Sequence, residues 1–259
     1  MSSNNSPLFR LEGRRALVTG ASSGLGRHFA LTLAKAGAEL VVAARRAEKL
    51  AELVEEIQQT GATTQAISLD VTDSASVAAA FDAIAAGGKA VDIIVNNAGV
   101  TVSKPLLEQS EADWDHVVGT NLRGSWLVSQ EGARRMIAAK SGGSIVNIAS
   151  ILGERVANHV GPYCVSKAGL IQATKSAALE LARYGIRVNA ILPGYIVTDL
   201  NRDFLAGEAG ERLRMRVPTR RFGHPEHLDG PLLLLASEAG IHITGAALAV
   251  DGGHLISSL

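Results

Sequence analysis

Three side chains near the middle of the chain, Ser150, Tyr163 and Lys167, have types and spacing that suit proton transfer to or from a carbonyl oxygen. The apolar, β-branched stretch at 144–149 predicts a buried strand, so Ser150 is expected at the C-terminal end of that strand. Pro162 favours the first turn of a following helix. Within that helix Tyr163 and Lys167 are four residues apart and therefore share one face. A hydroxyl, a phenol and an ammonium group are thus expected to converge on one spot.

The chemistry of this trio depends on making a tyrosine titrate near neutral pH. A free tyrosine has a pKa of about 10, so forming its phenolate at neutral pH costs about 4 kcal/mol. The Lys167 cation would favour the phenolate and lower that cost. Tyr163 could then donate a proton during carbonyl reduction and accept one during alcohol oxidation, with Ser150 hydrogen-bonded to the same oxygen. Because Tyr and Lys also occur four residues apart by chance, the surrounding elements must decide whether the pair is functional.

A glycine-rich turn near the N-terminus has the setting of a phosphate-binding turn. Residues 15–19 read as a short buried strand, and a helix-like segment runs on to Ala36 and is closed by Gly37. Glycines between a strand and a helix allow a tight turn and close approach to a pyrophosphate, although a simple tight turn is the alternative. The expected cofactor-binding residues here are Gly20, Ser22, Ser23, Gly24, Leu25 and Gly26.

The end of the second expected strand, residues 39–44, indicates which nucleotide binds. Arg45 and Arg46 follow that strand, and no acidic residue occurs between Leu40 and Arg46. In a dinucleotide-binding fold an acid at this place favours a free ribose 2′-hydroxyl, whereas an arginine accommodates a 2′-phosphate. The pattern therefore favours NADP over NAD. Solvated surface charge is the alternative for both arginines.

The rest of the chain alternates between strand and helix patterns. Strands are expected at 65–70, 91–95, 144–149, 187–193 and 246–250, and helices at 48–59, 74–86, 114–140, 162–182 and 225–236. This alternation predicts an α/β fold: one Rossmann-type, doubly wound parallel sheet of about seven strands flanked by helices. Residues 1–12 are expected to form a flexible tail and residues 13–259 the domain, with an irregular, mobile substrate lid at about 195–217.

Composition excludes several classes of protein. At 47% hydrophobic and 19% charged residues the chain can bury a large core, and its zero formal charge with no long basic run argues against nucleic acid as a partner. No run of about 18 apolar residues and no signal peptide is present, so no membrane association is expected. Cys164 is the only cysteine, which favours a cytoplasmic, reducing location. His224 and His227 lack partners for a zinc site, so no metal is expected.

Two further groups of residues follow strands on the expected cofactor side. Asp70 and Val71 end the third strand, where the carboxylate could meet the adenine amino group or cap the next turn. The segment Asn96-Asn97-Ala98-Gly99 ends the fourth strand with small residues, as close approach to a ligand requires. Asn121 lies in the middle of the long helix expected at 114–140. Because Asn is a poor helix former, it could hold a water, open the helix locally or simply be satisfied by packing.

Taken together, these motifs resemble the short-chain dehydrogenase/reductase family over about residues 13–253. The matching positions lie in the family's order and spacing: Thr19-Gly-x-x-x-Gly-x-Gly26, Asp70-Val71, Asn96-Asn-Ala-Gly99, Asn121, Ser150, Tyr163-x-x-x-Lys167, Pro193-Gly194 with Thr198, and Val250-Asp-Gly-Gly253.

The resemblance implies roles for these residues. Tyr163 would be the catalytic acid/base, Lys167 would lower its pKa and bind the nicotinamide ribose, and Ser150 would orient the carbonyl. Asn121 would support a water leading to Lys167. Pro193, Gly194, Ile196 and Thr198 would hold the carboxamide, and Asn97, Ala98 and Gly99 would also contact the cofactor. A homotetramer that buries two long helices and the last strand is implied as well.

The function expected from these residues is NADP-dependent hydride transfer between the nicotinamide and a ketone or secondary alcohol. A 3-oxoacyl-thioester reductase is the alternative enzyme, and a cofactor-binding sensor or scaffold is the alternative without catalysis. An apolar substrate pocket is expected from seven side chains, and a substrate hydrogen bond from His159 is a further option. Three arginines in the lid leave open an anionic carrier as substrate. The pocket residues are Ile151, Leu152, Val156, Val160, Tyr195, Phe204 and Leu205, and the arginines are Arg212, Arg214 and Arg216.

Overall fold

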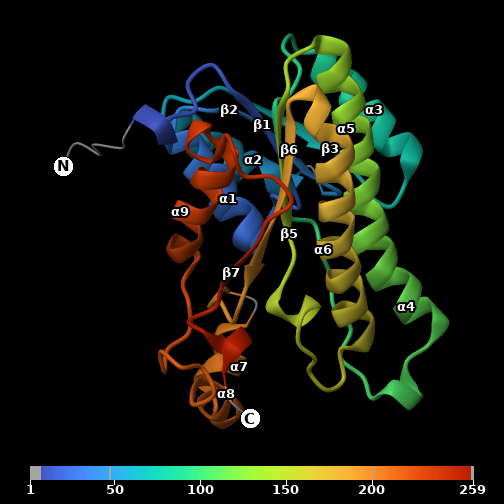
Figure 1. Cartoon of the computed structure of the whole chain (residues 1–259), viewed down its shortest axis with the longest axis vertical. Helices are drawn as coiled ribbons and strands as arrows, with labels where there is room; N and C mark the ends of the chain where they lie inside the picture. Colours follow the sequence, from blue (N-terminus) through green and yellow to red (C-terminus); the bar gives the residue numbers. More distant parts are fainter. Residues whose placement is uncertain (1–6, 47, 200, 258–259) are drawn as a thin grey trace.

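The chain folds around one parallel sheet, which confirms the predicted α/β class. The computed structural model describes residues 7–46, 48–199 and 201–257. Within them the sheet has seven strands in the order β3-β2-β1-β4-β5-β6-β7, and every neighbouring pair is parallel (Figure 1). The strands are β1 (Arg15–Thr19), β2 (Glu39–Ala44), β3 (Thr64–Ser68), β4 (Ile93–Asn96), β5 (Gly143–Ile148), β6 (Ile186–Pro193) and β7 (Ala247–Val250).

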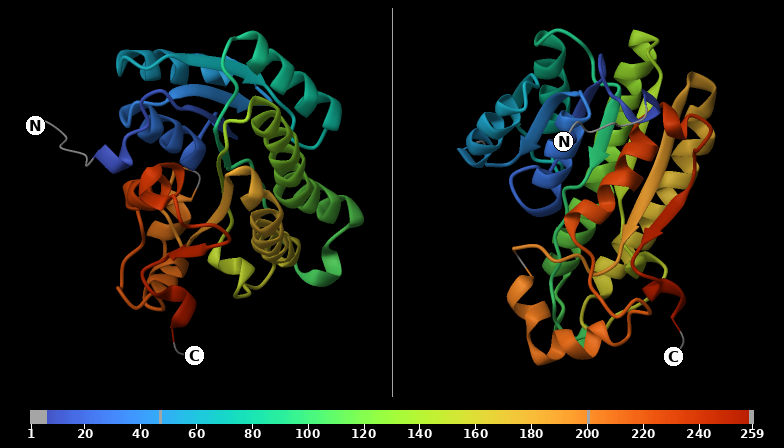
Figure 2. Two further views of the ribbon diagram at one scale, coloured as in Figure 1. Left: turned by 45° about the horizontal axis from the view of Figure 1, so that its top comes forward. Right: turned by 90° about the vertical axis from the view of Figure 1, so that its left-hand side faces the viewer.

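Helices cover both faces of the sheet because side chains alternate between its faces. In β1, Ala16 and Val18 belong to one buried cluster, whereas Leu17, between them, belongs to the other. The first cluster packs under α1, α2 and α9, and the second under α3, α5 and α6, which gives the three layers seen in Figures 1 and 2. These helices are α1 (Gly24–Lys35), α2 (Glu48–Gln59), α9 (Asp229–Ala236), α3 (Ser74–Ala86), α5 (Ser125–Ala139) and α6 (Gly161–Leu181).

The predicted long helix at 114–140 is wrong as a single element. It consists of α4 (Glu111–Val118), a π-helical turn (Gly119–Gly124) and α5. The α4 helix starts earlier than predicted because Ser110 and Asp113 form a reciprocal capping box at its N-terminus. The π turn contains Asn121, which confirms the option that this residue opens the helix locally.

The N-terminal boundary also differs from the prediction. Residues 1–6 lie outside the described part, but Pro7–Phe9 form a 3₁₀ turn. Leu11, assigned to the flexible tail, is only 1% exposed and donates its backbone N–H to the carbonyl of Ala36 at 2.8 Å. Burial of this one apolar side chain in the first core cluster attaches the segment to the domain.

Two further element boundaries are corrected. The strand predicted at 65–70 ends at Ser68, so Asp70 lies in the loop that follows. The helix predicted at 225–236 is a 3₁₀ turn (Pro225–Leu228) followed by α9.

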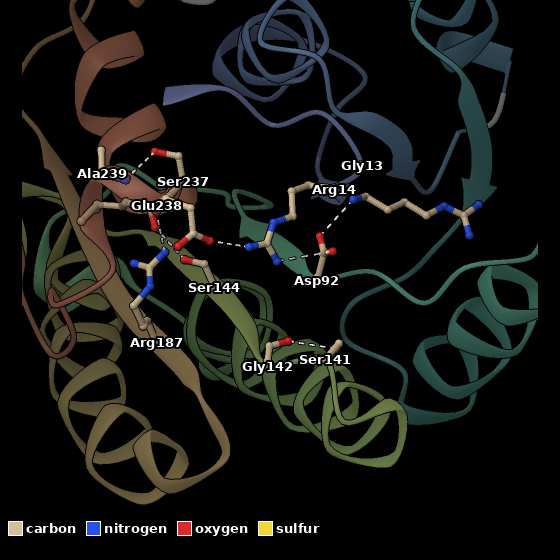
Figure 3. A network of polar contacts seen from close by, with 12 residues as sticks. Gly13, Arg14, Asp92, Ser141, Gly142, Ser144, Arg187, Ser237, Glu238 and Ala239 are labelled. Carbon is tan, nitrogen blue, oxygen red and sulfur yellow. Dashed lines mark hydrogen bonds and ion pairs between the residues drawn. The ribbon is translucent and has the colours of Figure 1, made fainter. Parts of the chain in front are cut away.

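A network of charges ties the amino ends of the strands together, opposite the edge where the motifs gather. Arg14 lies 3.8 Å from Asp92 and also pairs with Glu238 in the turn after α9 (Figure 3). Lys89 approaches the same Asp92 carboxylate at 3.4 Å. Because Asp92 precedes β4 and Arg14 precedes β1, these contacts join two neighbouring strands to the turn after α9. Figure 3 therefore shows a structural network rather than a site at the cofactor edge.

The predicted lid lies at the carboxyl end of the sheet. It contains two short helices, α7 (Arg202–Ala206) and α8 (Glu208–Arg214), placed beyond the end of β6 (Figure 1). The final 3₁₀ turn (His254–Ile256) lies at the same end of the molecule (Figure 2). Arg155, from the loop after β5, donates to the carbonyl of His254 and, at 2.8 Å, to the hydroxyl of Ser257. The C-terminal turn is therefore fastened to the loop between Ser150 and Tyr163.

Candidate active site

A large cavity runs along the carboxyl edge of the sheet, across β1 and β4. In the strand order the chain runs outward in opposite directions from these two strands, which is where open α/β sheets bind ligands. The cavity has a volume of about 1070 Å³. Nineteen of the predicted site residues line it: Gly20, Ser22, Ser23, Gly24, Leu25, Arg45, Arg46, Asp70, Val71, Asn97, Ala98, Gly99, Ser150, Tyr163, Lys167, Pro193, Gly194, Ile196 and Thr198. Gly26 and Asn121 lie behind this surface.

The glycine turn is held against the loop after β4 by a compact set of hydrogen bonds. The hydroxyl oxygen of Thr19 accepts from the backbone N–H groups of Asn97 and Ala98, both at 3.1 Å. The Asn97 amide donates in return to the carbonyls of Thr19 at 3.1 Å and Gly20 at 3.3 Å. A Cβ on Gly26 would lie 2.2 Å from the Gly20 oxygen, so only glycine fits there. The turn is thereby fixed at the junction of the two strands.

The surface above this turn fits the phosphates of a dinucleotide. Gly24 begins α1 with φ +53°, and a Cβ built there would meet nothing within 4 Å. Ser23, at the N-cap, makes no side-chain hydrogen bond to the helix. The first backbone N–H groups of α1 are thus accessible from the cavity, and a helix N-terminus with such donors favours an anion. The residues present therefore fit a nucleotide pyrophosphate.

Arg45 and Arg46 directly follow β2, at the position expected from the sequence. Arg45 and Arg46 are exposed and line the cavity. Asp70 faces the same region, and its carboxylate accepts from the Thr72 backbone at 2.9 Å and the Thr72 hydroxyl at 2.7 Å. These two bonds lower the pKa of Asp70, with a smaller contribution from the charge of Arg45. The Thr72 contacts hold the carboxylate in the turn after β3, in line with the capping option that the sequence left open.

Ser150, Tyr163 and Lys167 converge, as the sequence predicts. Ser150 caps the 3₁₀ turn after β5, accepting from the backbone N–H of Leu152 at 3.1 Å, and its hydroxyl lies close enough to the Tyr163 phenol to affect the pKa of that group. Lys167 lies one turn further along α6, with its Nζ atom 5.5 Å from the centroid of the Tyr163 ring. Burial is nearly complete for Lys167 and partial for Tyr163. The group can pass a proton to or from an oxygen placed at the phenol.

Burial dominates the electrostatics of this group. It raises the pKa of Tyr163 above its ordinary value, and the nearby Ser150 hydroxyl partly opposes the rise. Burial lowers the pKa of Lys167 to about 8. The predicted lowering of the Tyr163 pKa by Lys167 is not present in this conformation. The reason is geometric: the Lys167 ammonium donates to the main-chain carbonyl of Ile148 at 2.7 Å rather than pointing at the phenol.

Asn121 is held in place by three side-chain hydrogen bonds. Its Oδ1 accepts from the backbone N–H of Val100 at 2.8 Å, and its Nδ2 donates to the Val100 carbonyl at 2.9 Å and to the Ser166 hydroxyl at 3.1 Å. The residue is fully buried. Its side-chain amide therefore joins the loop after β4 to α6, next to Tyr163 and Lys167. The support of a water leading to Lys167, which the resemblance implies for Asn121, stays a prediction.

A residue not singled out from the sequence fixes the loop expected to hold the carboxamide. Asn201 accepts from the backbone N–H of Thr198 at 2.8 Å and donates to the carbonyl of Ile196 at 2.9 Å. The same loop is anchored by Gly194, which donates to the Val250 carbonyl at 3.0 Å, and by a bridge between Ile196 and Gly223. The sequence signal was an Asn three residues after Thr198, at the start of a short helix, where Asn commonly bonds to nearby backbone.

The cavity continues past Tyr163 into a substrate end of mixed character. Ile151, Leu152, Val160, Tyr195 and Phe204 line it as predicted. Two predicted pocket residues do not: Val156 is 87% exposed outside it, and Leu205 is buried behind it. Polar residues absent from the prediction also line it, namely Thr101, Ser103 and Asn158.

Tyr195 lies among aromatic rings at the substrate end. Its ring lies between those of Phe222 and His254, at centroid distances of 6.2 and 5.7 Å. Burial raises the pKa of its phenol, which therefore stays protonated at neutral pH. His159, which the sequence offered as a substrate contact, is exposed and does not line the cavity. Its carbonyl accepts from the backbone N–H of Lys104 at 2.9 Å.

The histidines at 224 and 227 and the arginines of the lid contact mainly residues close to them in the sequence. The histidine pair at 224 and 227 is joined by a bond from the His224 backbone to the His227 ring at 3.0 Å. Across the described residues there is no group of three or more His, Cys, Asp or Glu side chains that could hold a metal. No helix among them is long and apolar enough to cross a membrane. In the lid, Arg212 pairs with Glu208 at 2.6 Å and Arg214 with Glu211 at 2.5 Å.

Comparison with known proteins gives matches along nearly the whole chain. A family model described as Enoyl-(Acyl carrier protein) reductase matches residues 20–254. The chain is 39% identical over 248 residues to D-threitol dehydrogenase of Mycolicibacterium smegmatis, covering 96% of this chain and 95% of that protein. It is also 39% identical over 241 residues to a 3-oxoacyl-(acyl-carrier-protein) reductase of Staphylococcus aureus, covering 93% and 97%. Among solved structures, a gluconate 5-dehydrogenase from Burkholderia cenocepacia in complex with NADP and tartrate superposes with a TM-score of 0.93, at 38% identity over 97% of this chain and 98% of that one.

Proposed function

The chain belongs to the short-chain dehydrogenase/reductase family and is an NAD(P)-dependent oxidoreductase acting on a ketone or secondary alcohol, and on that premise we propose that it uses NADP with Tyr163 as its acid/base. The observation that carries the proposal is the convergence of Ser150, Tyr163 and Lys167 at the edge that also bears the glycine turn.

In carbonyl reduction, Tyr163 gives its phenolic proton to the substrate oxygen, and the nicotinamide, when bound, supplies the hydride to the carbonyl carbon. Ser150 hydrogen-bonds to the same oxygen and holds it at the phenol. In alcohol oxidation Tyr163 takes the hydroxyl proton instead. The buried Lys167 cation stabilises the phenolate left after proton donation, once its Nζ turns from the Ile148 carbonyl towards the ribose and phenol.

The preference for NADP rests on Arg45 and Arg46, which line the cavity at the end of β2 and are exposed there. Two guanidinium groups can form charge-assisted hydrogen bonds with a ribose 2′-phosphate. The similar gluconate 5-dehydrogenase was crystallised with NADP, which supports the proposal. The backbone from Pro193 to Thr198 would hold the carboxamide.

Reduction of a 3-oxoacyl thioester is the second candidate, because the Staphylococcus aureus reductase is as similar to this chain as the threitol dehydrogenase. Two of the three lid arginines that could attract an anionic carrier, Arg212 and Arg214, are paired with glutamates of their own helix. This pairing weakens the second candidate.

The test is an absorbance assay of nicotinamide turnover with NADP(H) and NAD(H) over ketones, secondary alcohols and 3-oxoacyl thioesters. We expect turnover of ketone or alcohol with NADP(H) at higher kcat/KM than with NAD(H). Turnover confined to acyl thioesters would support the second candidate, and absence of turnover with every substrate would contradict both.

The proposal includes a homotetramer and a cytoplasmic location. On α5 and α6, Trp126 is 50% exposed, Val165 48% and Leu179 83%, so these helices present apolar side chains to the surface. Burying them against other copies supports the assembly implied by the family resemblance, and light scattering of the purified protein gives its mass. The location rests on the single cysteine, Cys164.

A further inference from the structure

The substrate end of the cavity contains hydroxyl and amide groups and no ionised side chain among the residues described there. Its polar members are Thr101, Ser103, Asn158 and Tyr195, and its apolar members include Ile151 and Phe204. The cationic side chains that line the cavity, Arg45, Arg46 and Lys167, all belong to the part expected to hold the nucleotide.

The polar side chains come from two loops that are joined directly. The backbone N–H of Lys104 donates to the His159 carbonyl at 2.9 Å, and Gln109 donates to the Lys104 carbonyl at 2.9 Å. This contact brings the segment with Thr101 and Ser103 beside the segment with Asn158. Within the described chain the side chains of these three residues make no hydrogen bond, so their donors and acceptors remain available to a ligand.

Two cationic side chains of the neighbouring loops, Lys104 and Arg155, are engaged elsewhere. Lys104 forms an ion pair with Asp113 at 2.7 Å, and that contact holds the pKa of Asp113 at about 2. Arg155 donates to the His254 carbonyl and the Ser257 hydroxyl. Arg216 is exposed on the lid and does not line the cavity, although its charge partly opposes the rise that burial causes in the pKa of Tyr195. A substrate carboxylate or phosphate bound at this end would therefore meet no cation among the side chains that line it.

From this distribution we infer that the enzyme acts on an uncharged polyhydroxylated secondary alcohol and the corresponding ketone. The inference rests on the proposed function and specifies its substrate class. Hydroxyl groups next to the reacting carbon would bond to Thr101, Ser103 and Asn158, and the carbon chain would lie against Ile151 and Phe204. An unpaired carboxylate there is unfavourable because burying a charge is costly unless it is paired. A long acyl chain would leave the hydroxyls and amide without partners.

Matched pairs of alcohols test the inference, because each polyol and its aldonate differ only in a terminal hydroxymethyl group or carboxylate. The kcat/KM for NADP reduction is measured with threitol and threonate and with glucitol and gluconate, beside cyclohexanol and a 3-hydroxybutyryl thioester. We expect the preferred polyol to exceed its aldonate and the thioester by about tenfold or more. A preference for either aldonate or for the thioester overturns the inference and leaves the proposed hydride transfer intact. No turnover of any alcohol with either nucleotide overturns both.

Variants then show whether the named side chains carry the preference. The double change Thr101→Val and Asn158→Leu should lower kcat/KM for the preferred polyol about tenfold to a hundredfold, because two hydrogen bonds are lost. The kcat/KM for cyclohexanol should change by less than about threefold, since that substrate has no further hydroxyl to bind. Glu154→Gln, on the same loop but outside the cavity, is the control and should leave both values unchanged. Equal losses for polyol and cyclohexanol in the double variant overturn the assignment.

Discussion

The Nζ atom of Lys167 lies 5.5 Å from the centroid of the Tyr163 ring. At that distance the ammonium is close enough to act on the phenol, yet its hydrogen bond goes to the Ile148 carbonyl. Burial consequently keeps the pKa of Tyr163 raised and the phenol protonated. The arrangement suits proton donation to a carbonyl directly, whereas proton removal from an alcohol requires Lys167 to change its hydrogen-bond partner.

Replacing the phenol tests the acid/base role of Tyr163. Tyr163→Phe should lower kcat about 10²–10⁴-fold, because a positioned acid/base contributes that much to the rate. The dissociation constant of NADP, measured by fluorescence titration, should stay within a few-fold of the parent value. Tyr184→Phe, at an exposed position in the 3₁₀ turn (Ala182–Tyr184) that follows α6, is the control and should be fully active. Near-native turnover by Tyr163→Phe would show that another group moves the proton.

Lys167 is expected to cost stability in a pH-dependent way. Burial lowers its pKa to about 8 from the value of 10.5 for the unfolded chain, so the folded state binds this proton less tightly. The penalty is fully present below about pH 8, is on the order of 3 kcal/mol, and fades as the pH rises towards 10.5. Lys167→Met should therefore raise the free energy of unfolding near neutral pH, by less than the full figure because the Ile148 carbonyl loses its donor.

Urea unfolding of the nucleotide-free protein at about pH 7 and about pH 10 measures this difference. The advantage of Lys167→Met over the parent should shrink at the higher pH. Lys175→Met, at an exposed position of the same helix, should show no such pH dependence. A Lys167→Met variant that is less stable at both pH values would mean that the bond to Ile148 outweighs the burial of the charge.

The cofactor preference should follow the two arginines at the end of β2. Their charge-assisted contacts to a 2′-phosphate are worth about 1.5–3 kcal/mol, or roughly tenfold to a hundredfold in preference for NADP. Arg45→Ala should lose part of that preference, the double change with Arg46→Ala most of it, and Arg45→Asp should reverse it by repulsion. The measurement is kcat/KM for both nucleotides at fixed ionic strength, because salt screens exposed charges.

Arg183→Ala, in the 3₁₀ turn that follows α6, serves as the control for nonspecific loss of positive charge. A parent enzyme that prefers NAD, or arginine variants that leave the ratio of the two kcat/KM values unmoved, would show that Arg45 and Arg46 are only solvated surface residues.

Local patterns predicted most of the fold. The bounds of β1, β2, α2 and α3 match their predicted ranges to the residue, because each has an unbroken apolar pattern closed by polar or glycine residues. The π turn could not be predicted from local pattern, because Asn121 in that turn bonds to Val100, which is remote in sequence. Leu11 reads as part of a polar tail, and only its contact with the first core cluster reveals its burial.

In the site, too, the features set by local sequence could be predicted, and those set by contacts between distant residues could not. Motif spacing predicted which residues of β5 and α6 come together, because one strand end and one helix face place all three. The direction of the Lys167 side chain could not be predicted, since it depends on the position of the Ile148 carbonyl in the folded sheet. The hydroxyls of Thr101 and Ser103 were missed because loop residues carry no periodic pattern, and they reach the cavity through the contact between Lys104 and His159.

Asn201 is expected to control cofactor binding through the loop that it fixes. Its amide accepts from Thr198 and donates to Ile196, so it closes the loop expected to contact the nicotinamide carboxamide. Asn201→Asp keeps the acceptor but removes the donor and sets a carboxylate against the Ile196 carbonyl. Losing one such bond costs about 1 kcal/mol, so the KM for NADP should rise about fivefold or more, with less effect on the KM for the alcohol.

The loss should fall on the nucleotide rather than on folding, because Asn201 contacts a surface loop and not the core clusters. Measuring the dissociation constant of NADP together with the Tm separates the two effects. Asp203→Asn, an exposed change in α7 two residues later, is the matched control and should leave both unchanged. If Asn201→Asp lowers the Tm and leaves nucleotide binding intact, the residue only stabilises the start of the lid. If binding weakens at constant Tm, the bonds to Ile196 and Thr198 shape the nicotinamide end of the site.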